Sequence, residues 1–308
     1  MSKVCVIVNP NSAKGKGAKC IGKIERAFEK AGIRAEILVT GKAGDAEAMS
    51  LQACLSGFGT VVAAGGDGCV NEVVNGIMKS GRKVSMGIIP TGRGNDFAWV
   101  AGIPREIEKA VTLIACGTAR LIDTGYLEGG VFKDGHYFLN GTGFGFEPAI
   151  NFTAASYRHL NGMVSYIMAF FHCLIHIPAP YELELEVDGK KQNLCSQQIS
   201  VCNGRRMGSA FILAPNAILD DGLLDIVYAT RPVTRRQLLP MVISFFRGTQ
   251  LEKCSFMSQL RGRSVRITSR RRDLIIHTDG EFVSRDEEKC LVRIIPSSLS
   301  LFYGRAKV

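Results

Sequence analysis

The first 120 residues alternate short apolar runs with longer amphipathic stretches, which predicts a parallel sheet covered by helices. Strands are predicted over residues 4–8, 35–40, 60–64 and 85–90. Helices are predicted over residues 16–31, 43–55, 70–79 and 106–116. Ligands bind such sheets at the carboxyl ends of the strands. The loops of interest are therefore residues 9–16, 40–44, 65–69 and 91–96.

After about Asp123 the pattern changes to strand pairs separated by Gly and Pro, which predicts a second, mostly β domain. Its strands are predicted over residues 136–140, 181–187, 198–202, 223–228, 265–268 and 274–278. Two amphipathic helices, 163–177 and 234–247, are expected to pack on a sheet or touch a bilayer, core packing being commoner. The last apolar run, 291–303, could pair in either domain. We therefore expect domains 1–123 and 124–290, with 291–308 able to complete the first.

The composition is that of a globular, basic protein. Hydrophobic residues make up 46% and charged residues 21%, and 38 Lys and Arg against 28 Asp and Glu leave a net charge of +10. This excess favours contact with nucleic acid, nucleotide or anionic lipid. Residues 231–272 hold eleven Lys or Arg and one acid, Glu252, and could face lipid head groups or simply be solvated. No nucleic-acid partner is predicted, because this segment lacks interleaved aromatics and a module motif.

Ten cysteines show neither paired spacing nor a zinc-like cluster, so we expect reduced thiols in a cytosol. The first residues do not form a signal peptide, and no run of ~18 apolar residues occurs. We therefore expect a cytoplasmic protein with peripheral contact at the inner face of an anionic membrane. The oligomeric state, a homodimer included, is left open.

The strongest chemical signal is G-G-D-G-C-V-N-E, which begins at Gly65 between an apolar strand and a helix. Its glycines allow backbone amides to approach phosphate closely, and the helix start favours negative charge. Asp67 is placed to bind Mg²⁺ beside the phosphates, because this ion prefers hard oxygen ligands. The alternative is a glycine-rich turn that merely carries an aspartate.

Two more polar loops follow strands of the same predicted sheet. They are P-T-G-R-G-N-D-F-A from Pro90 and N-P-N-S-A-K-G-K-G from Asn9. The second is not a P-loop, since Pro10 replaces its leading Gly and Gly17 follows Lys16. A further glycine-rich run, G-T-G-F-G from Gly141, lies in the β-rich half and is interpreted as a turn near the domain junction.

Two acidic turns stand in the β-rich half. D-D-G-L-L-D from Asp220 could offer oxygens to a hard cation or form a turn without an ion. T-D-G-E ends an apolar strand at Glu281, which could be a general base or an ordinary surface residue. His172 and His176 lack the glutamate of H-E-x-x-H, so no metal site is predicted there.

Taken together, the motifs V-x-N-P-N-S, G-G-D-G-x-x-N-E-V-x-N-G, P-T-G-x-G-N-D-F-A, D-G-L-L-D and D-G-E resemble the diacylglycerol kinase-like lipid kinases, in particular their soluble bacterial members. The resemblance covers nearly the whole chain, in the family's order. It implies an α/β N-terminal nucleotide domain related to the NAD kinase and phosphofructokinase folds, and a C-terminal β-sandwich. It also implies ATP- and Mg²⁺-dependent phosphorylation of a membrane lipid, diacylglycerol being the first to test, in a cleft between the domains.

The resemblance implies roles for particular residues. Glu281 would be the general base, and Asp67 and Asp96 would help to hold the catalytic Mg²⁺. Motifs matching the family's nucleotide contacts comprise Asn9, Pro10, Asn11, Ser12, Ala13, Thr40, Gly66, Asp67, Gly68, Cys69, Val70, Asn71, Glu72, Thr91, Gly92, Gly94, Asn95 and Asp96.

A separate structural Mg²⁺ would use the Asp221 carboxylate and the carbonyls of Ile218 and Leu223. The family commonly has Thr or Ser where this chain has Cys69 and Arg93, and Arg93 could add charge near the triphosphate or alter substrate choice. The rivals are a soluble NAD or sugar-phosphate kinase and a non-catalytic lipid- or nucleotide-binding protein. The acceptor is left open among diacylglycerol, phosphatidylglycerol, sphingoid bases and undecaprenol-like alcohols.

Overall fold

The computed structural model of the chain describes residues 3–15, 17–157, 163–176, 179–208, 210–271 and 274–304. The chain forms two compact units, an N-terminal unit of Met1–Thr124 with Pro296–Val308 and a β-rich unit of Gly125–Ile295. It passes from one unit to the other within β5 (Arg120–Gly129) and β18 (Lys289–Leu301).

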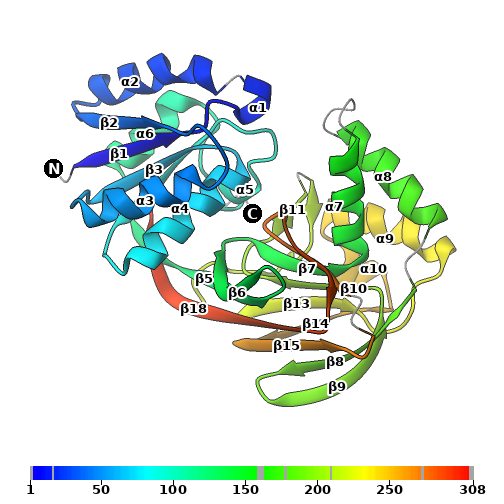
Figure 1. Ribbon diagram of the computed structural model, residues 1–308. Helices are drawn as coiled ribbons and strands as arrows, with labels where there is room; N and C mark the ends of the chain where they lie inside the picture. The colour runs from blue at the N-terminus through cyan, green and yellow to red at the C-terminus, as the bar shows by residue number, and fades with distance from the viewer. Residues whose placement is uncertain are drawn as a thin grey trace. The chain divides into compact units, whose positions relative to one another are not determined.

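The N-terminal unit is built on a parallel sheet with the strand order β2-β1-β3-β4-β18 (Figure 1). Its strands are β1 (Val4–Val8), β2 (Ala35–Val39), β3 (Thr60–Gly65), β4 (Ser85–Pro90) and the end of β18. β1 and β3 are buried along their whole length, which explains their uninterrupted apolar sequences. The prediction of an α/β N-terminal domain is confirmed.

Helices connect these strands, and one of them begins earlier than predicted. They are α1 (Ser12–Gly15), η1 (Ala18–Cys20), α2 (Ile21–Lys30), α3 (Asp45–Leu55), α4 (Asp67–Ser80), α5 (Asp96–Val100) and α6 (Ile107–Cys116). The backbone is extended at Gly66 and becomes helical at the next residue, so Asp67 stands in the first turn of α4. The acidic residue of the G-G-D-G motif is therefore fixed by a helix.

The β-rich unit is a sandwich of two sheets. One sheet has the order β14 (Met257–Gly262), β13 (Leu224–Ala229), β10 (Gln198–Cys202), β7 (Gly141–Gly145), β16 (Leu274–Thr278) and β17 (Glu281–Glu287). The other contains β5, β6 (Phe132–Phe138), β8 (Tyr181–Val187), β9 (Lys190–Ser196), β15 (Ser264–Ser269) and β18. The sheets share a core that includes Leu185, Ile226 and Ile276. The predicted mostly β sandwich is confirmed.

Helices cover the outer face of the first sheet (Figure 1). They are α7 (Phe146–Ser156), α8 (Met163–Ile175), α9 (Arg235–Arg247) and the short α10 (Gln250–Lys253), and β11 (Arg206–Met207) pairs with β12 (Phe211–Ile212) beside them. Thr234 and Gln237 form a capping box that starts α9. The expected core packing of α8 and α9 is confirmed for their inner faces. Residue 177, at the predicted end of α8, lies outside the described residues.

The interpretation of G-T-G-F-G as a turn is wrong. Gly141–Gly145 is the buried strand β7, paired with β10 on one side and β16 on the other. Its glycines make room for neighbours, because a Cβ at Gly143 would lie 1.9 Å from Glu147 Oε2 and 2.7 Å from His277 Nε2. The final apolar run pairs in both units, with β15 through Lys289–Arg293 and with β4 through Ser300 and Leu301.

Candidate active site

The predicted polar loops of the N-terminal unit meet at the carboxyl edge of its sheet. Asn9 N donates to Ala64 O at 3.0 Å, and Thr91 N donates to Gly65 O at 2.9 Å. The Ser12 and Thr91 hydroxyl oxygens are 2.9 Å apart. Three loops far apart in the sequence thus form one polar edge with amides and hydroxyls. Nucleotide binding by these groups stays a prediction.

Two of these turns touch backbone to backbone. A Cβ at Gly92 would lie 2.3 Å from Gly66 Cα, so a side chain at position 92 would force the turns apart. Asn95 closes the second turn in the left-handed conformation (φ 50°), where its Oδ1 accepts from Gly92 N at 3.0 Å and its Nδ2 donates to Gly92 O at 2.9 Å. The glycines therefore allow the two loops to act as one surface.

Asp67 links the same two turns through its carboxylate. Its Oδ1 accepts from Asp96 N at 2.6 Å and from Phe97 N at 3.4 Å. Burial raises the pKa of Asp67, and the amides of Phe97 and Asp96 oppose that rise only in part. The Asp67 carboxylate is partly buried, so a metal ion bound here would offset the cost of keeping its charge away from water.

Two aspartates, Asp67 and Asp96, suit Mg²⁺ that is shared with phosphate and water rather than a metal ion bound by protein ligands alone. Mg²⁺ is usually bound by one or two carboxylates together with substrate phosphates and water. Within the described parts of the chain, no group of three or more His, Cys, Asp or Glu residues could hold a metal ion. The two aspartates supply oxygen ligands of the right kind and number for an ion shared with a phosphate chain.

Several predicted nucleotide-binding residues have structural contacts of their own. Glu72 accepts from Gly44 N at 2.9 Å and Ala46 N at 3.0 Å, which places its carboxylate at the start of α3. Cys69 is buried, and burial raises the pKa of its thiol to about 12, so the thiol stays neutral. A Cβ at Gly65 would lie 2.4 Å from Cys69 Cβ, so Cys69 packs closely against the turn.

Sequence reasoning missed Arg105, which braces the second turn. Its Nη2 donates to Arg93 O at 3.3 Å and to Gly94 O at 3.2 Å, from the segment between α5 and α6. No motif points to this residue, because only the fold brings it to the turn. The Arg93 side chain is exposed. Lys16, the predicted source of charge in the first loop, lies outside the described residues.

In the β-rich unit, Asp279 anchors the turn that carries Glu281. Its carboxylate accepts the amides of Leu139 at 2.8 Å, Asn140 at 2.9 Å and Gly141 at 3.0 Å. The turn is thereby joined to the start of β7, while the Glu281 side chain is exposed. The role of Glu281 as a base stays a prediction.

A buried histidine connects this turn to α7. His277 Nδ1 accepts the Gly280 N–H at 3.1 Å, so the ring proton lies on Nε2 and is donated to Glu147 Oε2 at 2.5 Å. His277 is 1% exposed. Sequence reasoning missed both members of this pair, which stand 130 residues apart.

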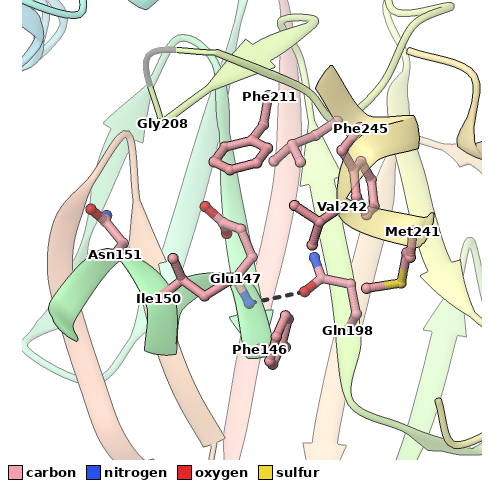
Figure 2. Close-up of a pocket in the computed structure, with 11 residues that line it drawn as sticks. Phe146, Glu147, Ile150, Asn151, Gln198, Gly208, Phe211, Met241, Val242 and Phe245 are labelled. Carbon is pink, nitrogen blue, oxygen red and sulfur yellow. Dashed lines mark hydrogen bonds between the residues drawn. The ribbon is translucent and has the colours of Figure 1, made fainter. Parts of the chain in front are cut away.

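Glu147 also lines an apolar pocket beneath α9 (Figure 2). The pocket is narrow, with a cavity volume of about 30 Å³. In Figure 2 the Glu147 carboxylate points toward Phe211, and the dashed line joins Glu147 N to Gln198 Oε1 at 3.0 Å. The lining residues are Phe146, Glu147, Ile150, Asn151, Gln198, Gly208, Phe211, Leu213, Met241, Val242 and Phe245.

At the position expected for a structural Mg²⁺, an arginine pairs with the carboxylates. Arg261 Nη2 contacts Asp221 Oδ2, and Arg261 Nε lies 3.2 Å from Asp225 Oδ1. The other Asp221 oxygen accepts from Leu223 N at 3.1 Å. A cation bound by Asp221, Ile218 and Leu223 would have to compete with this guanidinium, so the fit of Mg²⁺ here is poor.

A parallel sheet with glycine-rich turns and two aspartates, Asp67 and Asp96, at its carboxyl edge is typical of nucleotide-dependent phosphotransferases. Residues 3–127 match the family described as the Diacylglycerol kinase catalytic domain, and residues 141–303 match the YegS C-terminal NAD kinase beta sandwich-like domain. The chain therefore belongs to the diacylglycerol kinase family, and it is a lipid kinase. ATP is the phosphoryl donor that this family implies.

Relatives span both units. The chain is 34% identical over 229 residues to the Diacylglycerol kinase of Bacillus subtilis (strain 168), covering 74% of this chain and 73% of that protein. It is 32% identical over 222 residues to the Probable lipid kinase YegS-like of Yersinia pestis (strain Pestoides F), covering 70% and 71%. A crystal structure of a diacylglycerol kinase from Bacillus anthracis str. Sterne matches with a TM-score of 0.76 at 22% identity, covering 100% and 98%, which shows the shared fold.

Proposed function

We propose that this lipid kinase phosphorylates the hydroxyl of a membrane lipid, diacylglycerol first among the candidates, and thereby makes phosphatidic acid. The observation that carries the proposal is the pocket of the β-rich unit. Its walls include Phe146, Ile150 and Phe245, which suit an acyl chain and offer little to NAD or a sugar phosphate. Hydrogen bonds through Glu147 and His277 connect this pocket to the turn that precedes Glu281.

In the proposed reaction the hydroxyl oxygen bonds to the γ-phosphorus, the bond to the bridging oxygen breaks, and ADP leaves. Glu281 accepts the hydroxyl proton. Asp67 and Asp96 would hold Mg²⁺, which would neutralise charge on the phosphate oxygens. The amides and hydroxyls of the N-terminal edge, Ser12 and Thr91 among them, orient the triphosphate. Phosphoryl transfer depends chiefly on such positioning and charge neutralisation, so little else is asked of the protein.

Peripheral contact with an anionic membrane is part of the proposal, because a diacylglycerol acceptor resides in a bilayer. Among the helices of the described residues, none is both long enough and apolar enough to cross a membrane. The basic excess of the chain, +10, favours an anionic surface over a neutral one.

The test is phosphoryl transfer from labelled ATP to a series of acceptors, presented separately. Diacylglycerol, phosphatidylglycerol, a sphingoid base and undecaprenol would be supplied in mixed micelles, and NAD and a sugar phosphate in solution. We expect labelled product with diacylglycerol and none with the soluble acceptors. Transfer to NAD alone, or lipid binding without any transfer, would overturn the proposal.

A further inference from the structure

Large apolar side chains are exposed mainly on two helices of the β-rich unit. Among the described residues fourteen such side chains are exposed, and eight of them, five on α8 and three on α9, belong to these helices. Their exposed fractions run from 40% to 63%. The eight are Val164, Ile167, Met168, Phe171, Ile175, Leu239, Ile243 and Phe246. Exposed apolar patches of this kind mark interaction surfaces more often than scattered single residues do.

The spacing of these side chains gives each helix one apolar stripe. On α8 they stand three, four, seven and eleven residues after Val164, and on α9 they stand four and seven residues after Leu239. Residues with these spacings share a helix face. The opposite faces are buried, with Ala169 and Phe170 on α8 and Met241 on α9 in one core cluster.

The two stripes belong to neighbouring helices. Arg235 Nη2 on α9 donates to Ile175 O at the end of α8, at 3.0 Å. Both helices bury their inner faces in the cluster that covers β10 and β13 (Figure 1). Because both inner faces pack on that layer, both stripes lie on its outer side.

Positive charge borders the stripe of α9. Arg236 lies seven residues before Ile243 and Arg247 four residues after it, so both arginines share its face of α9. Both are exposed. Neither helix contains an acidic residue. Apolar side chains with flanking arginines and no acids suit a surface whose outer layer is anionic and whose interior is apolar.

We infer that the outer face of α8 and α9 is the surface by which this kinase docks on an anionic lipid bilayer. The inference rests on the proposed function, since it identifies how the enzyme reaches a bilayer-resident acceptor. The inner face of α9 contributes Met241, Val242 and Phe245 to the apolar pocket. A helix is about 10 Å across, so docking through α9 brings the pocket to within roughly one helix diameter of the bilayer.

The first experiment measures sedimentation with vesicles in the absence of ATP and diacylglycerol. Wild-type protein is mixed with vesicles of phosphatidylcholine alone or with about one third phosphatidylglycerol, at low and high salt. We expect binding to the anionic vesicles, weak binding to neutral ones, and loss of binding as salt screens the arginines. Equal binding to both vesicles, or none to either, would overturn the inference.

Variants then locate the surface. Ile167→Gln with Ile243→Gln should lower vesicle affinity more than tenfold, and Arg236→Gln about fivefold, the factor that ~1 kcal/mol per basic residue represents. The matched controls are Leu55→Gln and Arg82→Gln, exposed residues of the N-terminal unit that should bind as the wild type does. Equal losses in the controls, or none in the stripe variants, would contradict the assignment.

Two further measurements distinguish bilayer docking from dimer formation and from a loss of catalysis. Sedimentation velocity shows whether the stripe instead joins two copies of the chain, in which case its variants would dissociate a dimer and leave vesicle binding unchanged. Turnover of a short-chain diacylglycerol dispersed in solution should stay the same in the stripe variants. Vesicle binding that persists without turnover of any acceptor would refute the proposed function and leave the docking surface standing.

Discussion

The two acidic turns of this protein use their carboxylates differently. In the N-terminal unit Asp67 itself bonds to the amides of Asp96 and Phe97, so one residue both joins two turns and offers the charge for a metal. In the β-rich unit these tasks are divided, because Asp279 takes three amides and Glu281 remains exposed. With the proposed roles, the metal ligand would be partly buried and fixed by hydrogen bonds, whereas the base would stay accessible to the hydroxyl proton.

The largest effect on activity is expected at Asp67. We expect Asp67→Asn to lower kcat on the order of 10³-fold, since the amide keeps an oxygen for the Asp96 N–H but removes the charge that a metal needs. ATP-dependent transfer to diacylglycerol in mixed micelles measures this loss. A variant that retains more than a tenth of the wild-type rate would remove Asp67 from the mechanism.

Stability separates this loss from misfolding. Because burial raises the pKa of Asp67, its ionised form costs stability in the folded state. The cost is absent below the ordinary aspartate pKa of about 3.9, grows as pH rises toward the raised folded value, and is complete above it. Asp67→Asn should therefore be as stable as the wild type in acid and more stable at pH 7. Urea titrations at both pH values would contradict this if the variant were weaker at pH 7.

The next largest effect on activity is expected at the exposed Glu281. Glu281→Gln should lower kcat roughly 10²-fold through loss of the base, with the KM for ATP unchanged and no change in the urea midpoint. Glu288→Gln, another exposed acid of the same unit, is the matched control and should keep full activity. A wild-type turnover number in Glu281→Gln would show that the proton leaves by another route.

Asp279 should respond in the opposite sense, with stability lost before chemistry. In Asp279→Asn the side chain still tolerates the left-handed backbone (φ 47°). However, an NH₂ group replaces one of the two carboxylate oxygens that accept backbone N–H groups. Hydrogen bonds to a charged acceptor are worth about 1.5–3 kcal/mol each, so we expect a loss of about 2 kcal/mol in the free energy of unfolding. A loss within error in urea denaturation would mean that Asp279 does not hold the turn.

The smallest effect concerns the cation beside Asp221. Arg261→Gln leaves Asp221 and Asp225 without their guanidinium, and we expect about 1 kcal/mol of destabilisation, since Arg261 is partly exposed. Millimolar Mg²⁺ should restore stability in the variant and hardly change the wild type. Magnesium-dependent melting of the wild type itself would show that the ion displaces Arg261 and binds Asp221.

The sequence predicted those features that depend on short stretches of chain. The parallel strands β1 and β3 carry apolar runs, and polar residues or glycines follow them directly, so the sequence locates the polar edge of the sheet. The strand β7 was missed because Gly141, Gly143 and Gly145 have little β propensity. At Gly143, the side chains of Glu147 and His277 explain why glycine is needed.

Contacts between distant segments could not be read from the sequence. Arg105 reaches the carbonyls of Arg93 and Gly94 only because a loop folds back, and no motif marks it. His277 was missed because the sequence around it, an apolar strand, offers no partner. Its partner, Glu147, is 130 residues away in the chain and lies at 2.5 Å only in the folded protein. The Arg261 pairing likewise joins residues 40 positions apart in the chain. Such pairs depend on register and packing, which local patterns do not specify.

The most direct measurement is the transfer of the γ-phosphoryl group from labelled ATP to diacylglycerol in mixed micelles, by wild type and Asp67→Asn in parallel. Labelled phosphatidic acid from the wild type, with product formation about 10³-fold slower in the variant, is the predicted result. No labelled lipid from a correctly folded wild-type protein, or equal rates in the two, would contradict a lipid kinase that works through Asp67.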